Sequence, residues 1–249
     1  MKALIIGAAG FVGGHLIEYL HEIECVEVFA TKLSGKTIST KSIKEHNIFN
    51  LDILEAAQVN SLIGNIGPDY VFHLAAQSSV SLSWKKPALT YNINIIGVVN
   101  LLEAVKLLNK KTRVLLIGSA EEYGKVSPEQ LPISEEIPLK PENPYAVSKA
   151  AQEMTADIYV RAFGLDIIMV RAFNHIGIRQ APMFVISDFA KQIAEMEKGL
   201  REPVMHVGNL DVKRDFTDVR DIVRGYWMLA KSGKSGQVYN IGSGKSISI

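Results

Sequence analysis

The chain has 249 residues, 47% of them hydrophobic, and its 27 Lys and Arg residues nearly balance its 26 Asp and Glu residues. This composition is typical of a globular protein with one large domain, or one domain and a small lobe, and it excludes a strongly basic surface for nucleic acid. The one cysteine, Cys25, excludes an internal disulfide bond and favours a reducing compartment.

The N-terminal residues predict a buried strand, a glycine turn and a helix. In a dinucleotide-binding fold, Gly7 permits the sharp turn, Gly10 lets the backbone approach a pyrophosphate, and Gly13 lets the helix pack on the sheet. Phe11 and Val12 begin the helix, whose free N–H groups and positive dipole end favour a phosphate. The alternative is an ordinary strand–turn–helix unit of an α/β protein.

Strand-like and helix-like segments then alternate along the chain. This order predicts an α/β fold with a doubly wound, mostly parallel sheet and helices on both faces. The predicted strands cover residues 26–30, 70–74, 113–117 and 166–171, and the predicted helices cover residues 11–21, 53–63, 95–108 and 145–163.

The alternation weakens after residue 174. We therefore expect a dinucleotide-binding domain over residues 1–174 and a smaller, mostly substrate-binding lobe over residues 175–249, with segments that return to the sheet. Residues 242–249 are typical of a strand and turn running into a new helix, so we expect this lobe to be incomplete at the C-terminus. The chain enters a strand at once and has no apolar run long enough for a bilayer, so we expect no signal peptide, no membrane contact and a cytoplasmic protein.

The tip of the second predicted strand, Thr31-Lys32, would face the adenosine ribose. An acid there would favour NAD, whereas a basic residue would pair with a 2′-phosphate. Because the acid is missing and Lys32 is present, we expect NADP(H) to be preferred, with NAD(H) as a second cofactor. The alternative is a solvated surface lysine.

Two further stretches could contact the cofactor. The carboxylate of Asp52, before Ile53, could accept a hydrogen bond from the adenine amino group, although Asp is also a common helix N-cap. The small residues of Leu74-Ala75-Ala76 would let the backbone lie against a ribose. We expect His73 to be a core histidine with satisfied hydrogen bonds rather than a base.

Ser119, Tyr145 and Lys149 are the candidate catalytic residues. The four-residue spacing of Tyr145 and Lys149 places phenol and ammonium on one helix face, where Lys149 would lower the pKa of the phenol toward the working pH. Ser119, just past the fifth predicted strand, could hydrogen-bond the reacting oxygen. The alternative is a half-buried helix face, since this spacing often occurs by chance.

Taken together, these motifs resemble those of the extended short-chain dehydrogenase/reductases. The resemblance covers the whole chain, and residues 174–180 and 207–221 are similar to the GDP-sugar branch of that family. It implies a Rossmann fold, no metal, and NAD(P)H-dependent reduction of the C4 ketone of GDP-4-keto-6-deoxy-D-mannose to GDP-D-rhamnose. The motifs are Gly7-x-x-Gly10-x-x-Gly13, Asp52-Ile53, Leu74-Ala75-Ala76, Asn94, Ser119 and Tyr145-x-x-x-Lys149.

The resemblance also implies a role for each residue. Tyr145 would protonate the C4 oxygen while nicotinamide delivers hydride, Lys149 would hold the nicotinamide ribose, and Ser119 would orient the ketone. Asn94 belongs to the implied cofactor site. The implied substrate site adds Ser79, Asn174, Lys191 and Arg214, of which the last two could also be ordinary surface charges.

Two other functions stay open. One is a dehydratase or epimerase on the same scaffold, because Glu121 lies two positions before Tyr123, where 4,6-dehydratases carry the carboxylate that abstracts the C5 proton. The other is a non-catalytic dinucleotide-binding regulator, which has no need of Ser119, Tyr145 and Lys149 together. The usual Gly-Pro of the family reads Gly177-Ile178, so we expect that loop to sit differently.

We also expect a homodimer. The helices over residues 95–108 and 145–163 carry apolar residues on more than one face, and in this family the outer faces pair into a four-helix contact. The alternative is burial within one subunit. The residues concerned are Val98, Leu101, Leu102, Val105, Ala150, Met154 and Ile158.

Overall fold

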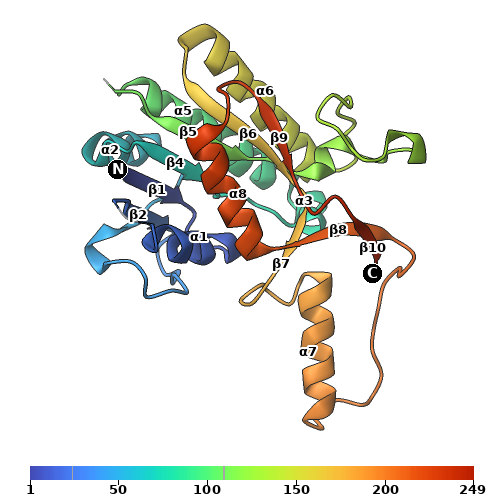
Figure 1. Ribbon diagram of the computed structural model, residues 1–249. Coiled ribbons are helices and arrows are strands. Elements are labelled where there is room, and N and C mark those ends of the chain that lie inside the picture. The colour runs from blue at the N-terminus through green and yellow to red at the C-terminus, as the bar shows by residue number, and fades with distance from the viewer. Residues whose placement is uncertain (24, 109) are drawn as a thin grey trace.

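A seven-stranded parallel sheet forms the centre of the computed structural model, which describes residues 1–23, 25–108 and 110–249 (Figure 1). Its strand order is β3-β2-β1-β4-β5-β6-β9, so the chain starts in the middle, winds to one edge, and then returns beside β1 toward the other. This is the doubly wound α/β fold that the alternation predicts. The strands are β1 (Lys2–Ile6), β2 (Glu27–Lys32), β3 (Ile48–Asn50), β4 (Tyr70–His73), β5 (Arg113–Ile117), β6 (Asp166–Ala172) and β9 (Val238–Ile241).

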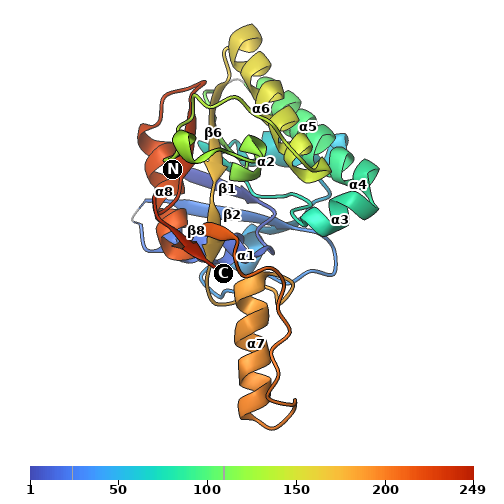
Figure 2. The same cartoon turned by 90° about the vertical axis from the view of Figure 1, so that its right-hand side faces the viewer.

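Helices cover both faces of the sheet and bury two separate cores (Figures 1 and 2). Successive side chains of β1 alternate between them: Ala3 and Ile5 lie in one core, and Leu4 and Ile6 lie in the other. The first core lies under α1 (Phe11–His21) and α8 (Val219–Ser232). The second lies under α2 (Ala56–Ile66), α5 (Gly97–Lys106) and α6 (Pro144–Phe163).

Shorter helical segments connect these elements. The helices α3 (Val80–Lys85) and α4 (Pro87–Tyr91) lead into a π-helical turn, η2 (Asn92–Ile96), which continues directly into α5. Such π-helical turns are rare and often occur at functional sites. The remaining short segments are the 3₁₀ turns η1 (Glu45–Asn47), η3 (Ala120–Tyr123) and η4 (Pro128–Gln130).

The continuous helix Pro87–Lys106 contradicts the expectation that no apolar run in the chain is long enough for a bilayer. It is long and apolar enough to cross a membrane by length and composition, with a window of mean hydropathy 1.4. Its inward-facing apolar residues, however, pack against α2 in the second core, and this burial accounts for their apolar character.

The same burial corrects part of the proposed dimer contact. Four residues assigned to that contact are at most 3% exposed and cannot form it, namely Val98, Leu101, Leu102 and Val105. Ala150 is likewise buried within the subunit.

Residues 173–237 form an excursion between β6 and β9. The excursion contains β7 (Asn174–Ile176), α7 (Val185–Glu197), β8 (Lys213–Asp218) and α8, and α7 projects away from the sheet (Figures 1 and 2). The last described strand, β10 (Ser246–Ser248), pairs antiparallel with β8, which also pairs with β7. The expectation that residues 242–249 run into a helix is therefore wrong, because their backbone completes this small sheet.

Candidate active site

The glycine turn lies at the C-terminal edge of the sheet between β1 and α1. Gly7 has a φ of 86°, and a Cβ there would lie 2.6 Å from the backbone nitrogen of Ala75. A Cβ on Gly13 would overlap the backbone of Ala8. The turn therefore needs glycine at both positions, one for its left-handed backbone and its contact with the β4 loop, the other for close packing of α1.

The first turn of α1 is open to a ligand. Gly10 is its N-cap, and no side chain caps the helix, so N–H groups at the helix start have no side-chain acceptor. A Cβ on Gly10 would meet only the Gly7 oxygen, at 3.3 Å. Phe11 and Val12 follow half-buried, and the Phe11 ring stacks on His175 of β7, with 6.0 Å between the ring centroids. Uncapped N–H groups beside an uncrowded glycine fit the pyrophosphate of a dinucleotide.

The tip of β2 carries the residues expected near the adenosine. Thr31 is buried and its Oγ1 accepts a hydrogen bond from the Gly7 N–H at 3.1 Å. Lys32 lies at the surface, where its Nζ donates to Asn50 Oδ1 at 3.1 Å. Asp52 is exposed and its Oδ1 accepts from the Leu54 N–H at 3.0 Å within the turn before α2, whose N-cap is Glu55.

The side chain of Ile53 points into the protein. It is 5% exposed and packs against Gly97 of α5, where an added Cβ would lie 2.8 Å from the Ile53 Cγ2 atom. Its side chain therefore belongs to the core, and only its backbone is left for a cofactor. The loop Leu74-Ala75-Ala76 is half-buried and lies against the glycine turn.

His73, at the end of β4, differs from the expected core histidine. It is 1% exposed, and neither ring nitrogen has a hydrogen-bond partner among the described residues. Burial lowers the pKa of His73 to about 3, and the charge of Lys149 acts in the same direction. The ring is therefore neutral at ordinary pH and its hydrogen bonds are not satisfied, contrary to expectation.

Asn94 lies buried in the π-helical turn and holds two parts of the site together. Its Oδ1 accepts from the Gln77 N–H at 2.8 Å, and its Nδ2 donates to the Gln77 oxygen at 3.0 Å and to Ser148 Oγ at 2.8 Å. Ser79 caps α3 by accepting from the Leu82 N–H at 3.2 Å. Both side chains therefore fix the loop after β4, and Asn94 also fixes it to α6.

Ser119 and Tyr145 meet at the C-terminal edge of the sheet. Ser119 is the N-cap of η3 directly after β5, and Asn143 caps α6 by accepting from the Ala146 N–H at 2.8 Å. This cap places Tyr145 in the first turn, buried, with its phenol next to the side chain of Ser119. Lys149 follows one turn later, and its Nζ donates to the Ile117 oxygen at 2.6 Å and to Gln152 Oε1 at 3.1 Å.

Burial dominates the electrostatics of this group. It raises the pKa of Tyr145 to about 12, with the charges of Glu122 and Glu121 adding to the effect and the neighbouring Ser119 hydroxyl opposing it. Burial also lowers the pKa of Lys149 to about 8, against the attraction of Glu122. The expectation that Lys149 lowers the pKa of Tyr145 is therefore wrong in this geometry. The phenol is neutral, which suits a group that gives up a proton.

Glu122 is the residue that sequence reasoning missed. It is fully buried, and its Oε1 accepts from the Ser119 N–H at 2.6 Å. Burial raises the pKa of its carboxyl to about 8. Its neighbour Glu121 is half-buried and accepts from Asn143 Nδ2 at 3.2 Å. The sequence signal was the adjacent pair of glutamates, whose different burial no pattern indicates.

The expected substrate residues of the lobe are exposed or lie at exposed ends of elements. Asn174 is exposed at the start of β7, and Lys191 pairs with Glu195 at 3.7 Å on α7. Arg214 is exposed on β8 and donates to the Lys213 oxygen at 3.0 Å. Within the described residues, no hydrogen bond or ion pair joins these three to the Ser119–Tyr145 group.

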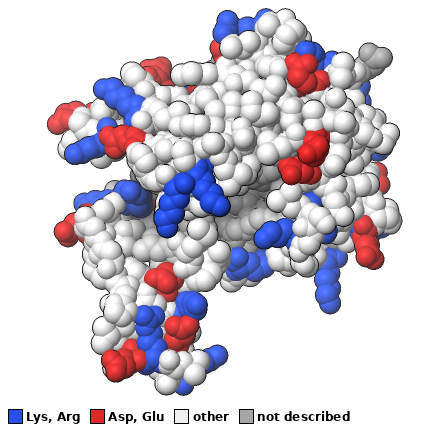
Figure 3. Space-filling model, turned by 180° about the vertical axis from the view of Figure 1, so that it is seen from behind, with Lys and Arg blue, Asp and Glu red and all other residues white. Residues whose placement is uncertain are grey.

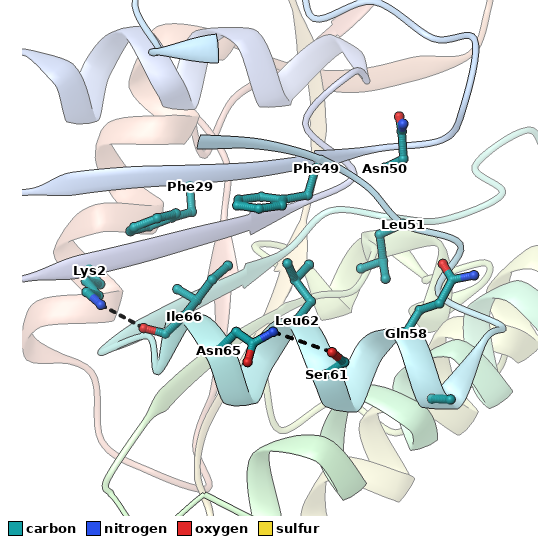
Figure 4. A pocket seen from close by; sticks show the side chains of 11 residues that line it. Lys2, Phe29, Phe49, Asn50, Leu51, Gln58, Ser61, Leu62, Asn65 and Ile66 are labelled. Carbon is teal, nitrogen blue, oxygen red and sulfur yellow. Dashed lines mark hydrogen bonds between the residues drawn. The ribbon is translucent and has the colours of Figure 1, made fainter. Parts of the chain in front are cut away.

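A groove elsewhere carries no such chemistry. It has a volume of about 700 Å³ and lies between α2 and the sheet edge, with Phe29, Phe49 and Leu62 among its lining residues (Figure 4). Its one cation, Lys2, donates to the Ile66 oxygen at 2.9 Å. Over the described ranges, no group of three or more His, Cys, Asp or Glu side chains could hold a metal ion.

Known proteins resemble this chain over nearly all its length. A GDP-6-deoxy-D-mannose reductase from Pseudomonas aeruginosa is 38% identical over 98% of this chain and 75% of its own length. A GDP-mannose 4,6-dehydratase from Yersinia enterocolitica is 31% identical over 100% of this chain and 69% of its own length.

Solved structures show the same fold. The structure of RMD from Pseudomonas aeruginosa complexed with NADPH has a TM-score of 0.85 and 36% identity, over 99% of this chain and 77% of that one. A Thermus thermophilus UDP-glucose 4-epimerase in complex with NAD has a TM-score of 0.86 and 29% identity, over 100% of this chain and 79% of that one. The model of the family described as GDP-mannose 4,6 dehydratase matches residues 4–249. The chain is an extended short-chain dehydrogenase/reductase with a dinucleotide-binding fold, and it belongs to the GDP-mannose 4,6-dehydratase family.

Proposed function

We propose that the protein reduces the C4 ketone of GDP-4-keto-6-deoxy-D-mannose to GDP-D-rhamnose. The observation that carries this proposal is the buried, neutral Tyr145 phenol, which lies next to the Ser119 side chain at the cofactor edge of the sheet, one helix turn before Lys149. A phenol in this state can donate a proton to a carbonyl oxygen as it becomes an alkoxide. The 38% identity to a GDP-6-deoxy-D-mannose reductase supports the same substrate.

The residues of the glycine turn would hold a nicotinamide dinucleotide, which supplies the hydride when bound. The N–H groups of Phe11 and Val12, which follow the N-cap Gly10, would bind its pyrophosphate. Ser119 would donate to the ketone oxygen, and Tyr145 would protonate it. Lys149, already fixed by the Ile117 oxygen, would bind the nicotinamide ribose.

NADP(H) is the cofactor that the tip of β2 favours. Lys32 is half-buried and its one hydrogen bond among the described residues is to the neutral amide of Asn50, so its charge has no carboxylate partner and is available for a 2′-phosphate. We expect Lys32→Ala to weaken NADPH binding and to leave NADH binding nearly unchanged, as measured by fluorescence titration. Equal loss of both affinities would contradict this preference.

Residues 1–174 would then bind the cofactor and carry Ser119, Tyr145 and Lys149, and residues 175–249 would mostly bind the substrate. The face of the molecule seen from behind is hollowed between the sheet and the lobe, with Lys and Arg side chains at its margin (Figure 3). Cations at such a margin suit a diphosphate. Asn174, Lys191 and Arg214 are the lobe residues proposed to meet the nucleotide, and Ser79 the residue proposed on the sheet side.

A dehydratase is the second candidate, and Glu121 is the observation that favours it. Its half-buried carboxylate lies next to the start of α6, where it accepts from Asn143. The test compares Tyr145→Phe and Glu121→Gln with GDP-4-keto-6-deoxymannose and NADPH. For ketone reduction, Tyr145→Phe should lower kcat by about 10²–10⁴-fold with little change in cofactor affinity, and Glu121→Gln should cost far less.

For dehydration the outcome reverses. Glu121 would have to take the C5 proton, so both variants should lose activity to a similar degree, with GDP-mannose consumed and no net NADPH oxidation. That result would replace the reductase proposal by the dehydratase. We further propose a homodimer and a cytoplasmic location, which suit an enzyme of this fold with one cysteine.

A further inference from the structure

The carboxyl of Glu122 is buried against the backbone on either side of Ser119. Its Oε1 accepts the Ser119 N–H at 2.6 Å, while its Oε2 is buried with no hydrogen-bond partner among the described residues. A Cβ on Gly118 would lie 2.5 Å from Oε1 and 2.8 Å from the Val170 oxygen, so glycine at that position leaves room for both the carboxyl and β6. Glu122 therefore packs closely against the backbone that carries Ser119.

Charged groups on two other elements face Glu122. On α6 these are Lys149 and Glu153, and on β6 the group is Arg171. Arg171 is already neutralised by Glu153, whose Oε1 lies 2.6 Å from its Nη2. Within this set, Lys149 is left without a carboxylate in direct contact, because its Nζ donates only to the Ile117 oxygen and Gln152 Oε1.

We propose that Glu122 is a positioning residue for the reduction: its buried carboxyl fixes the backbone that carries Ser119, and its negative charge keeps Lys149 in the cationic form. The inference rests on the proposed function for its consequence in catalysis, but the pairing itself is a property of the folded chain.

The two groups support one another as pH rises. Burial alone would make Lys149 lose its proton early, and the charge of Glu122 is the opposing cause. Glu122 becomes charged as pH rises past about 8, and its charge is one cause that keeps the pKa of Lys149 at about 8 rather than lower. Ionised Glu122 therefore extends the pH range over which Lys149 is cationic. The same charge acts on Tyr145 to hold the phenol protonated.

The variant Glu122→Gln separates charge from shape, because its amide oxygen can still accept the Ser119 N–H. We expect it to move the alkaline limb of the kcat/KM profile to lower pH by about 1 unit or more, with little effect at pH 6.5. Glu136→Gln makes the same change at an exposed position and is the control. An unchanged profile for Glu122→Gln would overturn the proposal.

A second measurement needs neither activity nor a folded variant. In the wild-type chain labelled with ¹³C at glutamate Cδ, NMR should show one carboxyl that titrates well above pH 6.5. If every glutamate titrates below pH 6, Glu122 is already ionised at pH 6.5 and the alkaline dependence proposed for it fails, even if the enzyme reduces the ketone. If the high titration is present but the ketone is not reduced, the proposed function fails and the pairing stands.

Discussion

His73 shows how burial fixes a charge state at a single residue. Its ring has no hydrogen-bond partner among the described residues, and the protein holds it neutral with a pKa of about 3. In the unfolded chain the imidazole has its usual pKa of 6.5, so above pH 6.5 it is neutral in both states and burial of the neutral ring carries no protonation cost. The stability present above pH 6.5 is lost as pH falls from 6.5 toward 3.

We therefore expect His73→Leu to make the protein less sensitive to acid. The wild type should lose up to about 1.4 kcal/mol of unfolding free energy for each pH unit below 6.5 through this group, and the variant should not. Urea denaturation at pH 7, 6, 5 and 4 measures the slope. His46→Leu changes an exposed histidine and is the control. Parallel slopes for wild type and His73→Leu would contradict this assignment.

Ser119, Tyr145 and Lys149 could be grouped as a candidate site from the sequence because their spacing from a strand end and along a helix has a direct chemical meaning. Glu122 could not, because its burial depends on β6 and α6 closing over η3 and on the absence of a Cβ at Gly118. The raised pKa of Tyr145 could not be predicted either, because its largest cause is burial, which the spacing of the residues does not indicate. Spacing places Lys149 on the right helix face, but only the packing shows its Nζ turned to the Ile117 oxygen.

At the scale of elements, Asn94 joins the π-helical turn to the loop after β4 and to α6. Replacing it with Ala would leave the Gln77 backbone groups and Ser148 Oγ without their buried partner. We expect Asn94→Ala to lower the unfolding free energy by about 1–3 kcal/mol. Asn65→Ala, on the exposed face of α2, is the matched control for urea denaturation. Equal midpoints for both variants would show that Asn94 does not hold these elements.

Elements with a strong pattern could be predicted, and short ones could not. The helix over residues 11–21 and the strand over residues 113–117 agree with α1 and β5 at both ends, since glycines and apolar runs mark them. The strands β7 and β10 have three residues each, too few for any periodicity. They form only because β8 offers a partner on each side, a long-range condition that the local sequence does not carry.

For the whole molecule, the outer face of α6 is the surface proposed for dimerisation. Met154 and Ile158 are 61% and 52% exposed there, one turn apart. We expect Met154→Glu combined with Ile158→Glu to give a monomer, because two buried charges at a two-fold contact would be unpaired. Light scattering after size exclusion measures the mass. Met228→Glu, on the exposed face of α8, should leave the dimer intact, and a monomeric wild type at micromolar concentration would refute the contact.

The position of β9 has a consequence for synthesis on the ribosome. β6 is fully buried, yet its neighbour β9 is made only after the excursion 173–237. Until then β6 is an edge strand, with the apolar run Ile167–Val170 unpaired along one side, as in strands that recruit other chains. We expect released chains that end at residue 237 to sediment as aggregates in a cell-free translation, whereas chains that end at residue 249 stay in the supernatant. Synthesis of the excursion thus delays the pairing of β9 with β6 and leaves the sheet incomplete until residue 241 has been added.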